Sequence, residues 1–181
     1  SPAAASTALG VAIERLNGTL GEVRRISQAL RPAMLDDLGL AAAIDQLARE
    51  FGSHANLPVE MQVEGDAPVL DDNIKTMLYR IAQEALTNIE RHAHASRVSI
   101  LLMFKPDGIH LSIADDGCGF DVTDVHHNPS HGIGLRNMRE RLDAVGGVLG
   151  IQSWPGLTTI SAWVPLTPAA AKAALRTASH Q

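Results

Sequence analysis

The chain has 181 residues but only one cysteine, Cys118, and its aromatic side chains are limited to three phenylalanines, two tryptophans and one tyrosine. A single cysteine excludes an internal disulfide, and no spacing of cysteine and histidine fits a zinc site. We therefore expect a reducing compartment and a cytoplasmic location. Because aromatic residues are scarce while 45% of the residues are hydrophobic, the core must consist mainly of aliphatic side chains.

Basic charge and long apolar runs are also lacking. There are 20 acidic against 15 basic residues, which gives a net charge of −5. Nonspecific nucleic-acid binding requires a basic surface, so no nucleic-acid partner is expected. No apolar run approaches the roughly 20 residues that a membrane-spanning helix needs, and the first residues do not resemble a signal peptide. A longer parent protein could still be anchored in the inner membrane.

Helical spacing of apolar residues dominates the first half of the chain. Apolar residues recur every three, four or seven positions from Leu9 to Leu30, which predicts a bundle or coiled-coil helix that ends at Pro32. The segment LRPAMLDDLGL then leads to a second helix over Leu40–Phe51. A third helix, over Ile74–Ile89, has the strongest helical pattern in the chain.

The remaining elements are short strands and one more helix. Residues 117–132 contain glycine, proline, Asp and His without periodicity, which predicts a long loop. A helix over Leu135–Val145 follows and ends at Gly146 and Gly147. Alternation predicts strands over Val59–Val63, Arg97–Phe104, Ile109–Asp115, Val148–Ser153 and Thr158–Val164.

A polar stripe lies along the third helix. Glu84, Asn88 and His92 are four residues apart, so α-helical geometry places them on one line, with Arg91 beside it. The Asn88 oxygen suits a hard cation such as Mg²⁺, Glu84 can orient or deprotonate a nucleophile, and Arg91 or His92 can contact phosphate. Taken alone, the stripe is more typical of ordinary exposed polar residues than of a binding site.

Two glycine-containing segments complete the candidate site. Asp115 ends a strand, and Gly117 and Gly119 allow the backbone to approach a flat ligand closely. The Asp115 carboxylate could accept a hydrogen bond from an exocyclic amine of such a ligand. Such residues also make ordinary tight turns. Gly132 and Gly134 open the helix that contains Leu135, where exposed N–H groups could bind phosphate. A flexible helix entry explains this pair of glycines equally well.

The combination and order of these segments resemble a known family. QEALTNIERHAHASRVSI resembles the N box of the GHKL ATPases, DDGCGF resembles their G1 box, and GIGLRNMRERLDAVGG resembles their G2 box. Together with LRPAMLDDLGL, they resemble the nitrate-sensor-like subfamily of two-component sensor histidine kinases over roughly residues 8–166.

The resemblance implies roles for individual residues. Asn88 would bind Mg²⁺ and Glu84 would be its acidic partner, with both acting in catalysis. Asp115 would recognise the adenine of ATP, and residues from Gly119 to 131 would form a lid. Family members usually end with a Gly-Thr pair. In this chain Thr158 stands in place of that glycine, and Thr159 is the candidate for the ATP-binding threonine. The further contacts to ATP would come from Arg91, His92, Gly117, Gly119, Gly132, Gly134 and Leu135.

The same resemblance implies the architecture and the partners. The fold would be an α/β two-layer sandwich, a Bergerat-type mixed sheet covered by helices on one face. Residues 1–35 would be the end of a dimerisation domain, 36–167 the ATP-binding catalytic domain and 168–181 a flexible tail. The phosphoacceptor histidine lies in a Glu-Leu-His-Asp context that this chain lacks, so we expect no self-phosphorylation.

In the complete kinase, the γ-phosphate of ATP would pass to a histidine of the dimerisation domain and then to an aspartate of a response regulator. The full-length protein is expected to be a homodimer. Two alternatives stay open: a stand-alone GHKL serine kinase or ATPase, and a nucleotide-binding module without catalysis. The segment LRPAMLDDLGL argues against the first, and the presence of Glu84, Asn88 and Asp115 argues against the second.

Overall fold

The computed structural model of the chain describes residues 33–123 and 133–167. The chain divides into two compact units, Ser1–Ala33 and Met34–Gln181, and the second contains nearly all of the described residues. The predicted helix over Leu9–Leu30 and the predicted tail lie outside the described residues. The predicted domain limits at 35 and 167 therefore stay predictions.

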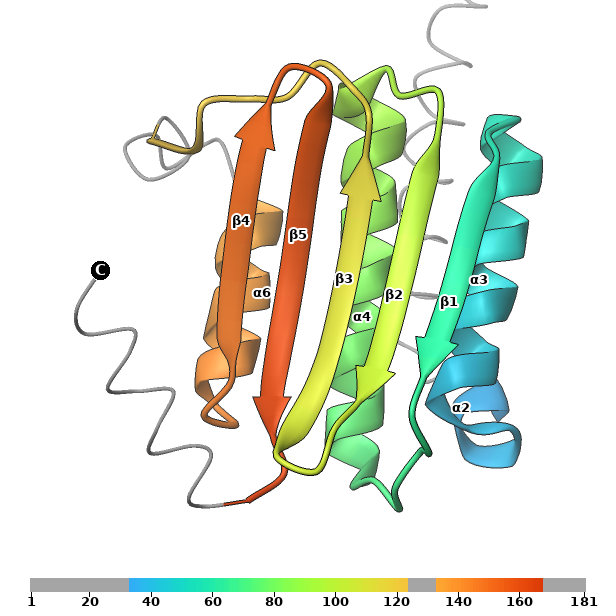
Figure 1. The fold of residues 1–181 in the computed structure, drawn as a ribbon, viewed down its shortest axis with the longest axis vertical. Helices are drawn as coiled ribbons and strands as arrows, with labels where there is room; N and C mark the ends of the chain where they lie inside the picture. Colours follow the sequence, from blue (N-terminus) through green and yellow to red (C-terminus); the bar gives the residue numbers. More distant parts are fainter. Residues whose placement is uncertain (1–32, 124–132, 168–181) are drawn as a thin grey trace, which may run out of the picture. The chain divides into compact units, whose positions relative to one another are not determined.

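A mixed sheet of five strands forms one layer of this unit, in the order β1-β2-β3-β5-β4 (Figure 1). Strand β1 pairs with β2 in parallel, and all other neighbours are antiparallel. Lys105 and Gly108 exchange backbone hydrogen bonds of 2.9 and 3.3 Å across the predicted β2–β3 turn. The strands are β1 (Val59–Glu64), β2 (Val98–Phe104), β3 (Gly108–Asp115), β4 (Val148–Trp154) and β5 (Leu157–Pro165).

Helices cover one face of the sheet and form the second layer (Figure 1). The longest are α3 (Gly39–Ala55) and α4 (Asp72–Asn88), and α6 (Ile133–Asp143) packs beside α4 against β4 and β5. A short helix, α2 (Ala33–Asp37), precedes α3. A π-helix, η1 (Ile89–Ala93), continues directly from α4.

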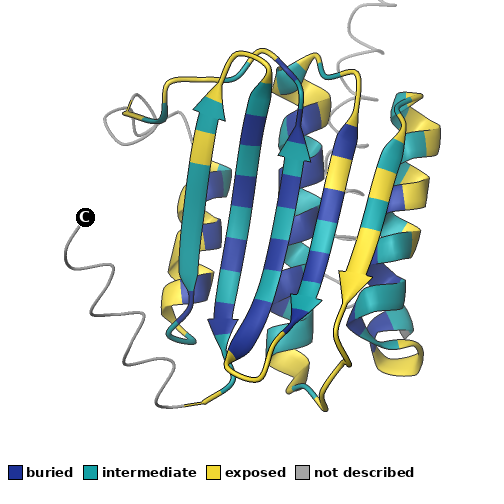
Figure 2. Cartoon of the chain, in the orientation of Figure 1, coloured by how far each residue is buried: buried dark blue, intermediate teal, exposed yellow. Residues whose placement is uncertain are grey.

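The core lies between these two layers. Along β2, β3 and β5, buried and partly exposed residues alternate, which Figure 2 shows as stripes. Successive side chains of a strand point to opposite faces, so only every second residue meets the helices. Aliphatic side chains fill this layer, as the composition predicts. The largest fully buried ones include Leu35, Ile44, Leu78, Ile81, Leu86, Ile100, Leu102, Ile109, Leu111, Ile113, Met138 and Leu142.

The predicted fold class is confirmed, and the predicted strands and helices within 33–123 and 133–167 agree with the structure to within a few residues. Two elements were not predicted. Helix α2 lies in the segment between the first two predicted helices. The π-helix η1 follows α4, where the sequence predicts the end of an α-helix. No helix in the described part of the chain combines the length and the apolar character that crossing a membrane requires.

Candidate functional site

Helix α4 carries the first part of the candidate site. Its start is fixed by Asp71, whose side chain accepts a hydrogen bond of 2.7 Å from the Asn73 backbone N–H. Burial of its apolar face then fixes the rotation of the helix, which leaves Glu84 and Asn88 half-buried. Among the described residues, neither of these two side chains has a hydrogen-bond or ion-pair partner. Within the described residues, their oxygen atoms therefore keep unused hydrogen-bonding capacity.

After Asn88, the last residue of α4, the chain continues as the π-helix η1, which contains Arg91 and His92. Hydrogen bonds in a π-helix join residues five apart, one more than in an α-helix. Arg91 and His92 are both exposed. Glu84 and Asn88 thus lie on the half-buried border of α4, whereas Arg91 and His92 lie on η1. That Glu84, Asn88 and His92 form one polar stripe stays a prediction.

Asp115 is the last residue of β3 and is 95% buried, with a relative exposure of 5%. One of its oxygens, Oδ1, accepts a hydrogen bond of 2.9 Å from the Gly117 backbone N–H. Its other oxygen has no partner in the described part of the chain. Burial raises the pKa of Asp115, the Gly117 hydrogen bond opposes this shift, and the charge of Asp116 adds to it. A buried acceptor is thus left open.

The loop after Asp115 is joined to the end of η1. The Cys118 backbone N–H donates to the Ala93 carbonyl at 2.8 Å, and the Cys118 thiol donates to the His92 carbonyl at 3.3 Å. A Cβ on Gly117 would collide with the Ala93 carbonyl group, so only glycine fits there. The loop therefore satisfies carbonyl groups that the helix end leaves without partners. This joins the predicted N-box and G1 segments.

The start of α6 meets α4 at Glu84. A Cβ on Gly134 would lie 3.0 Å from the Glu84 carboxyl carbon and 3.2 Å from its Cγ, so glycine lets the helix start approach this carboxylate closely. Leu135 is buried in the core, which leaves only its backbone for a ligand. Gly132 lies outside the described residues. The predicted N-box and G2 segments are thus in contact through Glu84 and Gly134.

Thr159 is not placed with the other predicted residues. It pairs with Ala114 across β3 and β5, whereas its neighbour Thr158 pairs with Asp115. Directly opposed residues share a face of a sheet, so Thr158 lies with Asp115 on the helix-covered face, where it is 7% exposed. The residue beside Asp115 on this face is therefore Thr158 and not the predicted Thr159. The sequence contained a signal for this face: Thr158 has the same two-residue spacing as the apolar residues Ile160, Ala162 and Val164, which are buried.

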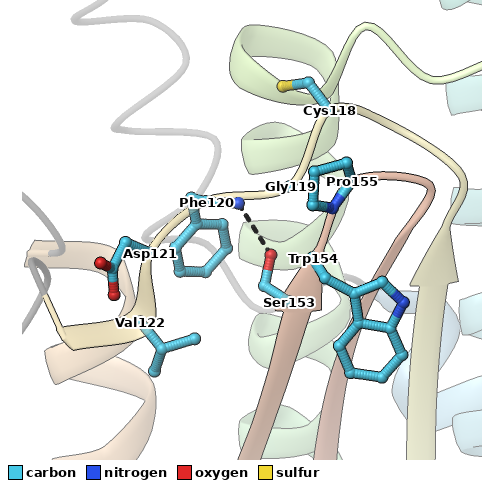
Figure 3. A pocket seen from close by; sticks show the side chains of 8 residues that line it. All are labelled: Cys118, Gly119, Phe120, Asp121, Val122, Ser153, Trp154 and Pro155. Atoms are coloured by element: carbon cyan, nitrogen blue, oxygen red, sulfur yellow. Dashed lines mark hydrogen bonds between the residues drawn. The ribbon is translucent and has the colours of Figure 1, made fainter.

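A hollow of about 530 Å³ lies beside these residues, between the loop after Asp115 and the β4–β5 turn (Figure 3). Phe120, Trp154 and Pro155 provide much of its lining. Gly119 is the only predicted site residue among those that line it. Its backbone φ is +69°, and a Cβ there would lie 2.6 Å from the Trp154 carbonyl oxygen, so glycine allows the two segments to pack together.

The geometry therefore joins three separate segments through two contact points. Glu84 contacts the start of α6, and Ala93 contacts the loop that follows Asp115. Residues 73–168 match the family described as histidine kinase-, DNA gyrase B-, and HSP90-like ATPase, over more than half of the chain. The chain belongs to this family. Family membership makes it an ATP-binding domain and confirms the predicted use of a nucleotide.

Relatives in sequence are sensor histidine kinases. The chain is 39% identical over 153 residues to the sensor histidine kinase MctS of Rhizobium johnstonii, covering 84% of this chain and 33% of that protein. It is 33% identical over 148 residues to the sensor histidine kinase LiaS of Bacillus subtilis, covering 81% and 40%. The chain thus spans about a third to two fifths of the length of these relatives.

Solved structures of histidine kinases share the fold. The histidine kinase AdeS of Acinetobacter baumannii aligns with a TM-score of 0.59 at 17% identity, over 86% of this chain and 80% of that chain. The histidine kinase domain of the blue-light activated kinase from Erythrobacter litoralis EL346 aligns with a TM-score of 0.57 at 19% identity, over 70% and 65%. These likenesses support the sandwich architecture.

Proposed function

We propose that this chain is the ATP-binding catalytic part of a sensor histidine kinase and that it presents ATP and Mg²⁺ to a histidine on a separate dimerisation domain. The observation that carries the proposal is Asp115. A carboxylate that is 95% buried, with one oxygen held by Gly117 and the other open, needs a donor from a ligand. The exocyclic amine of adenine is such a donor.

The helix residues provide the chemistry at the phosphate end of the proposed site. Asn88 would hold Mg²⁺, which supplies positive charge to the phosphate oxygens when bound. No cluster of three or more His, Cys, Asp or Glu side chains able to hold a metal occurs in residues 33–123 and 133–167. That fits Mg²⁺, which in nucleotide sites takes few protein ligands and relies on phosphate oxygens.

Glu84 is the proposed catalytic carboxylate. It is half-buried without a protein partner in the described residues and lies against the start of α6, where helix N–H groups favour phosphate. Glu84 would orient the phosphoacceptor imidazole and take its proton as the nitrogen attacks the γ-phosphorus. The new P–N bond forms as the bond from phosphorus to the ADP oxygen breaks. Arg91, His92 and the backbone at Gly134 would contact phosphate oxygens.

The proposed partners follow from this chemistry and from the similarity to the sensor histidine kinases MctS and LiaS. The phosphohistidine would donate its phosphoryl group to an aspartate of a response regulator, and the complete kinase would be a homodimer. The sequence contains no histidine in a Glu-Leu-His-Asp context, so we expect this chain to transfer phosphate to a separately supplied domain.

Titration with ATP in the presence and absence of Mg²⁺ tests the proposal. Substitution of Asn88→Ala should weaken Mg²⁺-dependent ATP binding at least about tenfold, the effect of losing one charge-assisted contact. Asn73→Ala is the matched control, since the same change is made at the far, exposed end of α4. Equal affinities for the two variants would contradict the metal role of Asn88.

Transfer of the γ-phosphate tests the kinase class. With ³²P-labelled ATP, the fragment should label a separately supplied dimerisation domain that contains the phosphoacceptor histidine, and the label should be lost in acid, as expected for a phosphoramidate. Release of inorganic phosphate without transfer would instead indicate a stand-alone ATPase. Acid-stable labelling of a serine would indicate the serine-kinase alternative.

A further inference from the structure

Three side chains form a row across the strand ends on the helix-covered face of the sheet. Asp115 of β3 pairs with Thr158 of β5, and Thr158 pairs with Ser153 of β4. The Ser153 and Thr158 hydroxyl oxygens are 2.9 Å apart and share a hydrogen bond. The row therefore links the buried carboxylate to the edge strand through two neighbouring hydroxyl groups.

Ser153 also holds the loop that follows Asp115. Its hydroxyl oxygen accepts a hydrogen bond of 2.9 Å from the Phe120 backbone N–H, which Figure 3 shows as a dashed line. A hydroxyl oxygen has two lone pairs and one proton, so Ser153 can serve Phe120 and Thr158 at the same time. Ser153 thus joins the β4 strand end to a backbone position five residues beyond Asp115.

Backbone contacts bring the same two segments together but fix a different part of the loop. The Gly156 N–H donates to the Gly117 carbonyl at 2.8 Å, and Gly119 packs against the Trp154 carbonyl. At Phe120, the Ser153 hydroxyl accepts the backbone N–H from the β4 side of the hairpin. Loss of this hydroxyl would remove the hydrogen bond at Phe120 and leave the contacts of Gly117 and Gly119 in place.

We propose that Ser153 is a positioning residue for recognition of the base: it holds Phe120 in the loop that follows Asp115, and its hydrogen bond to Thr158 positions the strand neighbour of Asp115. This inference rests on the proposed function and deepens it. Ser153 does not contact the ligand in this account. Its effect on the ligand passes through the loop and through Thr158, so it should appear as a change in base discrimination.

The experiment compares three variants of the same β4–β5 hairpin. Ser153→Ala removes the hydroxyl, Ser153→Thr keeps it on a residue that strands favour, and Ser161→Ala is the matched control. The Ser161 hydroxyl donates a hydrogen bond of 3.4 Å to the Gly150 carbonyl, and Ser161 pairs with Ser112, away from the row. Affinities for ATP and GTP, amide hydrogen exchange at Phe120 and thermal unfolding are measured for each protein.

Loss of the Ser153 hydroxyl should lower the ratio of ATP affinity to GTP affinity about fivefold, which corresponds to about 1 kcal/mol. Exchange at the Phe120 amide should accelerate in the same variant. Ser153→Thr should restore both, and Ser161→Ala should change neither. A merely structural role would lower the unfolding temperature and leave the ATP-to-GTP ratio unchanged, which would overturn the proposal.

Failure of the proposed function is distinguishable from failure of this inference. If the wild-type chain does not bind ATP, the proposed function is overturned, and the exchange rate at Phe120 alone then decides whether Ser153 holds the loop. Unchanged exchange at Phe120 in Ser153→Ala overturns the inference in either case.

Discussion

Asp115 and Asp116 are adjacent in the chain but lie in opposite environments. Asp115 is buried, with one oxygen bound to Gly117 and the other open. Asp116 is half-exposed at the surface, and it accepts hydrogen bonds from the Ser96 backbone N–H at 2.7 Å, the Ser96 hydroxyl at 2.6 Å and the Arg97 N–H at 2.9 Å. These hydrogen bonds lower the pKa of Asp116 to about 2, whereas burial raises that of Asp115.

The comparison separates a carboxylate available to a ligand from one used to hold the fold. Strand alternation sends the two side chains to opposite faces. Asp116 fixes the turn between η1 and β2, and Asp115 keeps an unfilled acceptor on the helix-covered face. Glu84 resembles Asp115 in one respect: although it is only half-buried, its carboxylate also keeps oxygen atoms without a hydrogen-bond partner among the described residues. Open carboxylates therefore mark the proposed site.

The largest expected effect comes from exchanging Asp115 for its amide. Because the Gly117 N–H fixes the Oδ1 position, Asp115→Asn would place its NH₂ group where the open oxygen now lies, so a donor would face the adenine amine. ATP affinity should fall about tenfold to a hundredfold, equivalent to about 1.5–3 kcal/mol. Isothermal titration with ATP measures this loss.

The neighbouring substitution Asp116→Asn is the matched control, because it makes the same chemical change one residue away. It should leave ATP affinity within about twofold, since a contact that holds the fold contributes equally to the free and bound forms. The amide introduced by Asp115→Asn should also favour guanine, whose O6 is an acceptor, so GTP affinity should rise relative to ATP. Equal losses of ATP affinity in both variants would remove the distinction between the two carboxylates.

A smaller effect is expected from Gly134→Ala. The added methyl group would displace the Glu84 carboxylate, because it would lie about 3.0 Å from the Glu84 carboxyl carbon. Phosphoryl transfer to a dimerisation domain supplied in trans should slow about tenfold, since misplacing a catalytic group is costly. Single-turnover transfer kinetics measure the rate.

A double-variant cycle shows whether Glu84 transmits this effect. If Gly134→Ala acts by moving Glu84, it should slow transfer no further in a Glu84→Gln background. Independent, additive losses would show that Gly134 acts through its backbone contacts to phosphate and that Glu84 is not the group displaced.

The sequence was sufficient to predict the sheet and its covering helices, because Ile74–Ile89 and the strand segments have strong periods that tertiary packing preserves. The order of the motifs also led to Glu84, Asn88 and Asp115, whose roles in ATP binding stay proposals. The π-helix was not predictable in this way, since the Cys118 N–H that donates to the Ala93 carbonyl at its end comes from a loop far along the chain.

The position of the threonine shows a second limit. Motif matching pointed to Thr159, whereas the two-residue period of β5 places Thr158 on the face of Asp115. A shift of one residue in a strand moves a side chain to the other face. The sequence does not show the proposed role of Ser153, because that role depends on a contact with Phe120, 33 positions away in the chain.

The smallest expected effect is the pH dependence of stability, in which the two aspartates should act with opposite signs. The folded pKa of Asp116, about 2, lies below its ordinary value of 3.8, so this carboxylate stabilises the fold above about pH 4 and loses that contribution as the pH falls toward 2. Asp115 has a raised pKa, so its ionisation destabilises the ligand-free fold, and the penalty disappears as the pH falls through its folded pKa.

Urea unfolding midpoints from pH 7 down to pH 3 measure both contributions. The urea midpoint of Asp116→Asn should lie below that of the wild type by a constant margin down to about pH 5, and this difference should narrow below about pH 4. The urea midpoint of Asp115→Asn should instead equal or exceed that of the wild type at pH 7. The difference should disappear at lower pH, as the wild-type Asp115 carboxyl group takes up a proton. Parallel curves for the wild type and both variants would mean that neither aspartate changes its proton affinity on folding, and the assignment of one open and one closed carboxylate would lose its electrostatic basis.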